Sequence, residues 1–407
     1  MKKSKVRNII EGILYAILGA VALAGIGFGC YKLYNSLFKV QIKEVNSKWE
    51  NLPLGYKEYS TNNSFKIQLH TSKDANSVTI SSGTAWSWYW KEHQNNSKLY
   101  DWYLITNFHV VNDAIAYSLN LNEKDTNHNV IISESNANKL LESYKNNYKF
   151  AFDKYEISLK KWRENNNYIE NENYIDILDN LRNYIKELNI ITDFQNDNIN
   201  LFSEKENNTN ISNDAQEYNL DMALIKMTFD FTNFTNNNNI SYQNNNISYP
   251  ILNYMSSLDK NIKYDKNLKV FIAGNPANKK NLVGVEINSE FRNDEKSLID
   301  IPDLILKKLK APYLYSKDNY DNFPLSEGAS GSPVYQDINY KINGEVNLNL
   351  PIDWIKKIPI GIYWGGQTIG IQMKPSFIPF IVNGTLANGV NYNIFDNFIN
   401  AINDNKL

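Results

Sequence analysis

A chain of 407 residues with 42% apolar and 13% aromatic side chains can bury a substantial core, which excludes a disordered protein. Its 42 Lys and Arg residues nearly balance 44 Asp and Glu residues, for a formal net charge of -2. Because phosphate binding needs basic side chains gathered on one face, and no such cluster occurs beyond the N-terminus, we expect no nucleic-acid partner.

The first 39 residues are predicted to form a membrane anchor. Four basic residues between positions 2 and 7 precede an almost wholly apolar stretch from Ile13 to Leu33. A span needs about 20 apolar residues, whereas a cleaved signal usually has an apolar core of about 7 to 15. The basic residues predict a cytoplasmic N-terminus. We therefore expect a single-pass protein of the cell membrane, with a linker over 40–62 and the remainder outside the cell.

Cys30 is the only cysteine, so the outer part of the chain can contain no disulfide. A cysteine late in an apolar leader can also be the lipidation site of a bacterial lipoprotein. Gly27, Phe28 and Gly29 make a poor cleavage site for that pathway, which favours a lipid-facing or helix-packing cysteine.

Beyond the linker, the pattern predicts a mainly β protein with two helical regions. Short alternating or β-branched segments predict strands near Phe65 to Leu69, Val78 to Ile80, Tyr103 to Ile105, Met222 to Met227, Leu268 to Ala273, Leu282 to Ile287, Val334, Ile358 to Tyr363 and Ile369 to Gln372. Between Asn136 and Leu188, apolar residues recur every three or four positions in two sets, separated by Asn165 to Asn167. This spacing predicts a helical hairpin. A similar stripe from Ile394 to Ile402 predicts a C-terminal helix.

Three residues have local contexts that suit hydrolytic chemistry. Ser330 lies in a glycine-flanked turn, which can expose a hydroxyl beside converging backbone N–H groups, although such a turn is often only a turn. His109 ends an apolar strand, where a general base can be held at a cleft edge, although a structural core histidine can also lie there. Asp221 precedes another apolar strand and could orient the histidine, or merely cap the strand.

Taken together, these segments resemble the triad motifs of chymotrypsin-like peptidases, especially bacterial trypsin-like and HtrA-like ones. The three segments are Thr106 to Val111, Asp221 to Lys226, and Gly328 to Pro333. Gly83-Thr84-Ala85 resembles the strand that faces the histidine, and Ile272 to Pro276 resembles the opening of the second barrel.

A nearer resemblance is to the mollicute surface peptidases that include the mycoplasma immunoglobulin protease. It rests on Gly361 to Gly366, on the anchor, and on the Asn-rich insertion between His109 and Asp221. The resemblance implies a chymotrypsin-like double β-barrel: a first barrel over 63–240 with the helical insertion at about 136–215, and a second barrel with the C-terminal helix over 241–407. It also implies a protein substrate, immunoglobulin heavy chain, delivered by a separate antibody-binding protein.

The same resemblance implies the roles of individual residues. Ser330 is the nucleophile, His109 the general base and Asp221 its orienting acid, while the N–H groups of Gly328 and Ser330 form the oxyanion hole. Tyr363, Trp364 and Gly365 pair with the substrate backbone, and Pro324 lies at the floor of the specificity pocket, where it gives no support for a Lys or Arg preference. No metal or cofactor is expected.

Ala329 stands where animal members of the fold carry an aspartate that binds a newly cleaved N-terminus. We therefore expect an enzyme that needs no N-terminal cleavage. Two alternatives remain at this stage: a catalytically inactive surface module of the same fold that binds host protein, and a quality-control protease, which would lack the usual peptide-binding domain after the protease region.

Overall fold

The computed structural model describes residues 42–43, 60–71, 79–111, 122–124, 130–132, 155–162, 174–191, 203–204, 218–233, 269–292, 314–336, 359–382, 392–404 and 407, apart from one to three positions inside some ranges. The chain divides into two compact units, Met1–Lys43 and Glu44–Leu407. Of the first unit only strand β1 (Ile42–Lys43) is described, so the expected anchor and Cys30 lie outside the described residues. Within the described ranges, no helix is long and apolar enough to cross a membrane.

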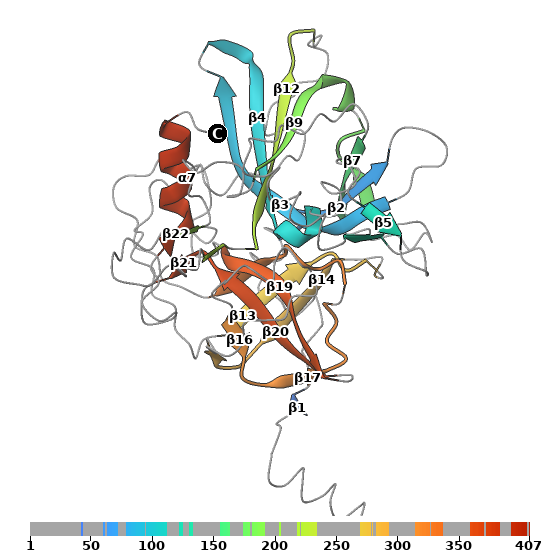
Figure 1. Ribbon diagram of the computed structural model, residues 1–407, viewed down its shortest axis with the longest axis vertical. Helices are drawn as coiled ribbons and strands as arrows, with labels where there is room; N and C mark the ends of the chain where they lie inside the picture. Colours follow the sequence, from blue (N-terminus) through green and yellow to red (C-terminus); the bar gives the residue numbers. More distant parts are fainter. Residues whose placement is uncertain are drawn as a thin grey trace, which may run out of the picture. The chain divides into compact units, whose positions relative to one another are not determined.

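The second unit contains a first antiparallel sheet whose strands all lie between residues 64 and 230. Its order is β8-β7-β2-β3-β4-β12-β9, and the sheet is strongly curled (Figure 1). The strands are β2 (Ser64–Thr71), β3 (Thr79–His93), β4 (Asn96–Thr106), β7 (Tyr155–Trp162), β8 (Tyr174–Asp176), β9 (Ile185–Ile191) and β12 (Ala223–Asp230).

Alternation in the sequence explains these strands. On β2, Phe65, Ile67 and Leu69 are buried, whereas the intervening Lys66 and Gln68 are half-buried. Strand β12 is buried along nearly its whole length because it lies between β4 and β9.

A second curled antiparallel sheet comes from residues between 270 and 379, with the order β17-β20-β19-β18-β13-β14 and with β16 joining β15 to β20 (Figure 1). Its strands are β13 (Val270–Gly274), β14 (Val283–Ile287), β15 (Phe291–Arg292), β16 (Leu314–Ser316), β17 (Asn319–Asp321), β18 (Pro333–Gln336), β19 (Pro359–Ile369) and β20 (Gln372–Pro379). Ile369 at the end of β19 pairs with Gln372 at the start of β20. The single strand that we expected over these residues is therefore wrong, because they belong to two antiparallel strands.

Short two-stranded pairs complete the described β structure. They are β5 (Asn122–Lys124) with β6 (Val130–Ile132), β10 (Ser203–Glu204) with β11 (Tyr218–Asn219), and β21 (Ile381–Val382) with β22 (Tyr392–Asn393). The mainly β class is therefore confirmed. The proposed division into two barrels near residue 240 falls outside the described residues and stays a prediction.

The expected helical hairpin is wrong wherever it falls on described residues. Residues 155–162 and 185–191 are strands β7 and β9, and the only helical piece between them in the described residues is a single 3-10 turn, η2 (Arg182–Tyr184). Tyr155, Leu159 and Trp162 have helical spacing, but Ile157 and Leu159 are both buried, which is the two-residue period of a strand. Leu188 and Ile190 repeat that period on β9. The other expected residues of the hairpin, 136–154 and 163–173, lie outside the described residues.

The expected C-terminal helix is confirmed as α7 (Ile394–Asn403), which stands beside the first sheet (Figure 1). Asn393 is its N-terminal cap, and the side-chain oxygen of this residue accepts hydrogen bonds from the N–H groups of Phe395 and Asp396. Phe395 stacks on Trp88 with ring centroids 5.3 Å apart, and Phe398 meets Trp88 and Tyr103 edge to face. The helix thereby closes the core of the first sheet.

We expect Phe398→Ala to lower the free energy of unfolding by about 3–5 kcal/mol, because it empties a fully buried aromatic site. Urea denaturation of the full chain, followed by tryptophan fluorescence, measures the change. Asn400→Ala, at an exposed position of the same helix, should stay within about 0.5 kcal/mol of wild type. Equal losses in the two variants would contradict the role assigned to the buried face of α7.

Candidate active site

His109 and Asp221 lie at neighbouring strand ends of the first sheet. His109 is in a helical turn over 108–111 that follows β4, and Asp221 precedes β12. In the antiparallel β4–β12 pair, Ala223 lies opposite Thr106, so the end of one strand meets the start of the other. This register brings the imidazole and the carboxylate together.

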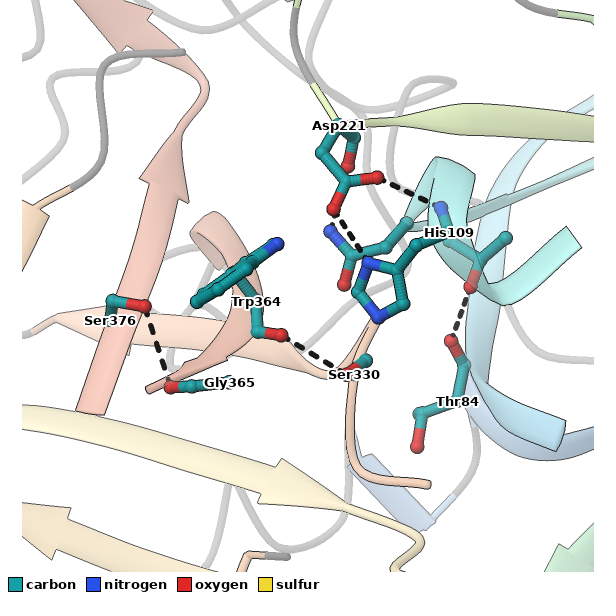
Figure 2. Close-up of polar contacts among 9 residues, drawn as sticks. Thr84, His109, Asp221, Ser330, Trp364, Gly365 and Ser376 are labelled. Atoms are coloured by element: carbon teal, nitrogen blue, oxygen red, sulfur yellow. Dashed lines mark hydrogen bonds and ion pairs between the residues drawn. The ribbon is translucent and has the colours of Figure 1, made fainter. Parts of the chain in front are cut away.

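Asp221 binds His109 through both carboxylate oxygens (Figure 2). Oδ1 accepts the backbone N–H of His109 at 2.9 Å, and Oδ2 lies 2.6 Å from His109 Nδ1. The Asp221 side chain is 1% exposed and that of His109 29%, so a buried carboxylate directs a partly accessible ring. A buried carboxylate needs donors, which assigns the Nδ1 proton of the neutral ring to this contact and leaves Nε2 as the acceptor.

Asn107 fixes the backbone on the other side of this pair. It is fully buried, and its Nδ2 donates to the backbone carbonyl of Asp221 at 2.7 Å. The aspartate is therefore held by its main chain as well as by its side chain. Asn107 lies in the segment from Thr106 to Val111, and an amide two residues before the histidine was the one sequence signal for this role.

Ser330 comes from the second sheet, in the turn that leads into β18, and the ring of His109 lies between Asp221 and Ser330 (Figure 2). The serine is half-buried, and its hydroxyl donates to the carbonyl oxygen of Trp364 at 3.0 Å. The structure thus brings together His109, Asp221 and Ser330. For the serine proton to pass to Nε2, the hydroxyl would have to turn from Trp364 toward His109. Hydrogen bonds of this kind commonly tighten only when substrate binds.

The turn before Ser330 holds its carbonyl groups away from the site. The Glu327 oxygen accepts the N–H of Ala277 at 2.7 Å, and the Ala329 oxygen accepts from both the N–H and the hydroxyl of Ser332. In a trans peptide the N–H points opposite to the C=O, so these bonds orient the N–H groups of Gly328 and Ser330. Within the described part of the chain, neither N–H donates a hydrogen bond.

Two glycines permit this turn. Gly328 has φ of 86° and Gly331 has φ of 92°, a region that side chains disfavour. A Cβ on Gly331 would lie 1.9 Å from the Thr84 carbonyl oxygen, so only glycine allows the turn to approach β3 this closely.

The expected substrate strand and pocket residues lie on the second sheet beside this turn. Tyr363 is fully buried, its N–H donates to Ser332 O at 2.7 Å, and its carbonyl accepts the N–H of Gly331 at 2.9 Å. Both its backbone groups are thus used within the protein. Trp364 and Gly365 follow as half-buried residues, and the ring of Trp364 meets the His109 ring edge to face at 6.4 Å.

Pro324 is half-buried, and the next residue is tied to the strand by the Tyr363 hydroxyl, which donates to Leu325 O at 3.0 Å. Burial raises the pKa of Tyr363 well above its usual value, so this donor stays protonated. The Phe323 ring lies 6.4 Å from that of Tyr363 and 5.9 Å from that of Tyr320. Pro324 thus directly follows, in the chain, a residue of an aromatic cluster. Among the described residues, no cluster of His, Cys, Asp or Glu could hold a metal ion.

The described residues thus form a mainly β protein in which a carboxylate, an imidazole and a hydroxyl come together where two curled antiparallel sheets meet. A family model described as Mycoplasma immunoglobulin protease matches residues 55–320, well over half of the chain, and the chain belongs to that family. The matched range includes His109 and Asp221 and ends before Ser330. A solved structure titled "Structure of GrC" aligns with 86% of this chain and 95% of its own, at 11% identity and a TM-score of 0.31. Among curated proteins, none matches.

We expect Gly331→Ala to be much more destabilising than Gly365→Ala. Both glycines have positive φ, at 92° and 137°, so both variants carry backbone strain of about 1–2 kcal/mol. A Cβ at Gly365 meets nothing within 4 Å, whereas one at Gly331 overlaps β3 and adds about 1–3 kcal/mol. Urea denaturation of both variants measures the difference. Equal destabilisation would mean that the turn does not approach β3 as closely as the structure has it.

Proposed function

We propose that this chain is a serine endopeptidase that uses His109, Asp221 and Ser330 as a catalytic triad. One observation carries the proposal: the His109 ring is bonded to a buried carboxylate at 2.6 Å, and its other edge faces a serine in a glycine-rich turn (Figure 2). A structural histidine would need neither the serine nor the exposed ring edge. The protease family to which the chain belongs supports a protein substrate.

In the proposed reaction, Ser330 Oγ forms a bond to the carbonyl carbon of a peptide as His109 Nε2 takes the serine proton. The carbonyl π bond breaks, and its electron pair becomes an oxyanion held by the N–H groups of Gly328 and Ser330. The electron pair of the oxyanion then re-forms the carbonyl π bond as the C–N bond breaks, and His109 gives its proton to the leaving amine. Water repeats the sequence on the acyl-enzyme, and Asp221 stabilises the imidazolium in both halves.

The register of the second sheet supports substrate binding along β19. Strand β18 pairs with β19 as far as Ile362, so the edge from Trp364 onward extends past β18 beside Ser330. An extended peptide could add to this edge as a further strand, with Trp364 and Gly365 as its backbone partners. Tyr363 is fully buried, so it would not contact the substrate but would support Pro324 from behind, through its hydroxyl bond to Leu325 O. Pro324 offers no charge to a Lys or Arg side chain, which favours an uncharged residue on the acyl side of the cleaved bond.

We extend the proposal to the finer identity of the protein. The two sheets would form a double β-barrel of the chymotrypsin type, anchored to the cell membrane by residues 1–39 with the enzyme outside. The family's description makes immunoglobulin the first substrate to test. We propose its heavy chain as the part that is cleaved and a separate antibody-binding protein as the partner that delivers it.

The test compares the full chain with Ser330→Ala and His109→Ala on immunoglobulin G and on an unfolded protein such as reduced casein. Both variants should lose activity by at least about 10⁴-fold, as triad losses do in other enzymes. His70→Ala, on β2 away from the site, is the matched histidine control and should retain activity. Cleavage by wild type and Ser330→Ala at equal rates would exclude the serine mechanism. Cleavage of casein without cleavage of immunoglobulin, when an antibody-binding partner protein is also present, would instead favour a quality-control protease.

A further expectation concerns activation. Ala329 is fully buried and uncharged, so it offers no carboxylate to a newly made N-terminus. We expect a fluorophosphonate to label Ser330 in the full-length, unprocessed chain, as detected by intact mass and peptide mapping. Labelling that begins only after N-terminal trimming would contradict this expectation.

A further inference from the structure

Thr84 of β3 makes four hydrogen bonds to three separate segments around the candidate site. Its N–H donates to Ser330 O at 2.8 Å, and its carbonyl accepts the Thr106 hydroxyl at 2.8 Å. Its own hydroxyl lies 3.2 Å from Gly328 O and 3.0 Å from the N–H of Asn275. The residue is fully buried, so water does not compete for these bonds.

The direction of each hydroxyl bond can be assigned from the partners. A carbonyl oxygen can only accept and a backbone N–H can only donate. The Thr84 hydroxyl therefore donates its hydrogen to Gly328 O and accepts from Asn275. Both bonds exist only because the side chain carries an oxygen at this position.

The peptide that Thr84 holds lies between the two peptides of the proposed oxyanion hole. The N–H groups of Gly328 and Ser330 belong to the peptides on either side of the one that contains Gly328 O. With φ of 86° and no Cβ, Gly328 sets only a weak steric limit on rotation of this peptide. Its orientation must come from hydrogen bonds, and the Thr84 hydroxyl supplies the one to Gly328 O.

We propose that Thr84 is a positioning residue for the oxyanion hole: its hydroxyl holds the Gly328–Ala329 peptide so that the Gly328 and Ser330 N–H groups converge. The inference rests on the proposed serine mechanism. Thr84 touches no substrate and moves no proton; it acts through the backbone of the turn. Removal of its hydroxyl should slow the formation of the oxyanion and leave substrate binding largely unchanged.

The test uses saturable inactivation of the full chain by a fluorophosphonate, which needs no knowledge of the natural substrate. Attack on phosphorus also places a negative oxygen in the hole, so the limiting rate kinact reports the geometry of the hole, and KI reports binding. Two matched pairs remove the hydroxyl: Thr84→Val replaces it by a methyl group, and Thr84→Ala lacks the hydroxyl that Thr84→Ser keeps. Direct loss of an oxyanion donor costs about 10²- to 10³-fold, so loss of its support should lower kinact by roughly 10- to 100-fold in each pair. KI should change by less than about threefold.

Thr228→Val is the control for loss of a buried threonine hydroxyl elsewhere in the first sheet. Thr228 lies on β12, five positions after Ala223, which pairs with Thr106. It is 6% exposed, and its hydroxyl donates to Asp101 of β4 at 2.6 Å. This variant should keep the wild-type kinact. Thr84→Val should also reach full labelling stoichiometry, only more slowly.

Several results would overturn the inference. Two are kinetic: an unchanged kinact in either pair, or an equal loss of kinact in Thr228→Val. The other two concern the folded state: a Thr84 variant of which only a fraction is labelled, at the wild-type rate, or one that has lost its near-UV circular dichroism. Each would mean that Thr84 supports the fold in general or has no effect on the hole. The proposed function fails in a different way, namely if wild type is not labelled at Ser330.

Discussion

The α-carbon of Gly331 packs against the backbone of β3, where a Cβ would lie 1.9 Å from the Thr84 oxygen. Because of this approach, Thr84 N–H reaches Ser330 O at 2.8 Å while Gly331 N–H reaches Tyr363 O at 2.9 Å. The turn that carries the serine is thereby bonded to the first sheet and to its own sheet at once. Any side chain at this position would push the turn off β3 and weaken the contact between sheets that assembles the site.

The contact between Asp221 and His109 depends on a second constraint, the pairing of β4 with β12. Because Thr106 lies opposite Ala223, the two strand ends are close together. The backbone N–H and the ring of His109 can then donate hydrogen bonds to the buried Asp221. A carboxylate that is 1% exposed would be unstable without such donors. The same contacts that make burial of the charge tolerable also orient the ring, so stability and the proposed catalytic geometry have a common cause.

Local patterns in the sequence are sufficient for some of this arrangement and not for the rest. The alternation of apolar and polar residues predicts β2, and the local sequence around each residue indicates His109, Asp221 and Ser330 separately. The helical interpretation of 155–162 failed because Tyr155, Leu159 and Trp162 also fit a helical period, and only the partner strand β2 decides between the two. Thr84 and Gly328 are 244 positions apart, so no local signal could predict their bond. What the sequence cannot supply is register and long-range contact.

The turn around Ser330 is organised by neutral groups of the folded chain. Glu327 O, Gly328 O, Ala329 O and Ser330 O each accept a hydrogen bond, from Ala277, Thr84, Ser332 and Thr84 respectively. None of these donors is created by cleavage of the chain, and none titrates near neutral pH. A hole built in this way would be formed as soon as the protein folds. On the proposed function, control of the enzyme must then act before the chemical step, through access of the protein substrate to the edge of β19.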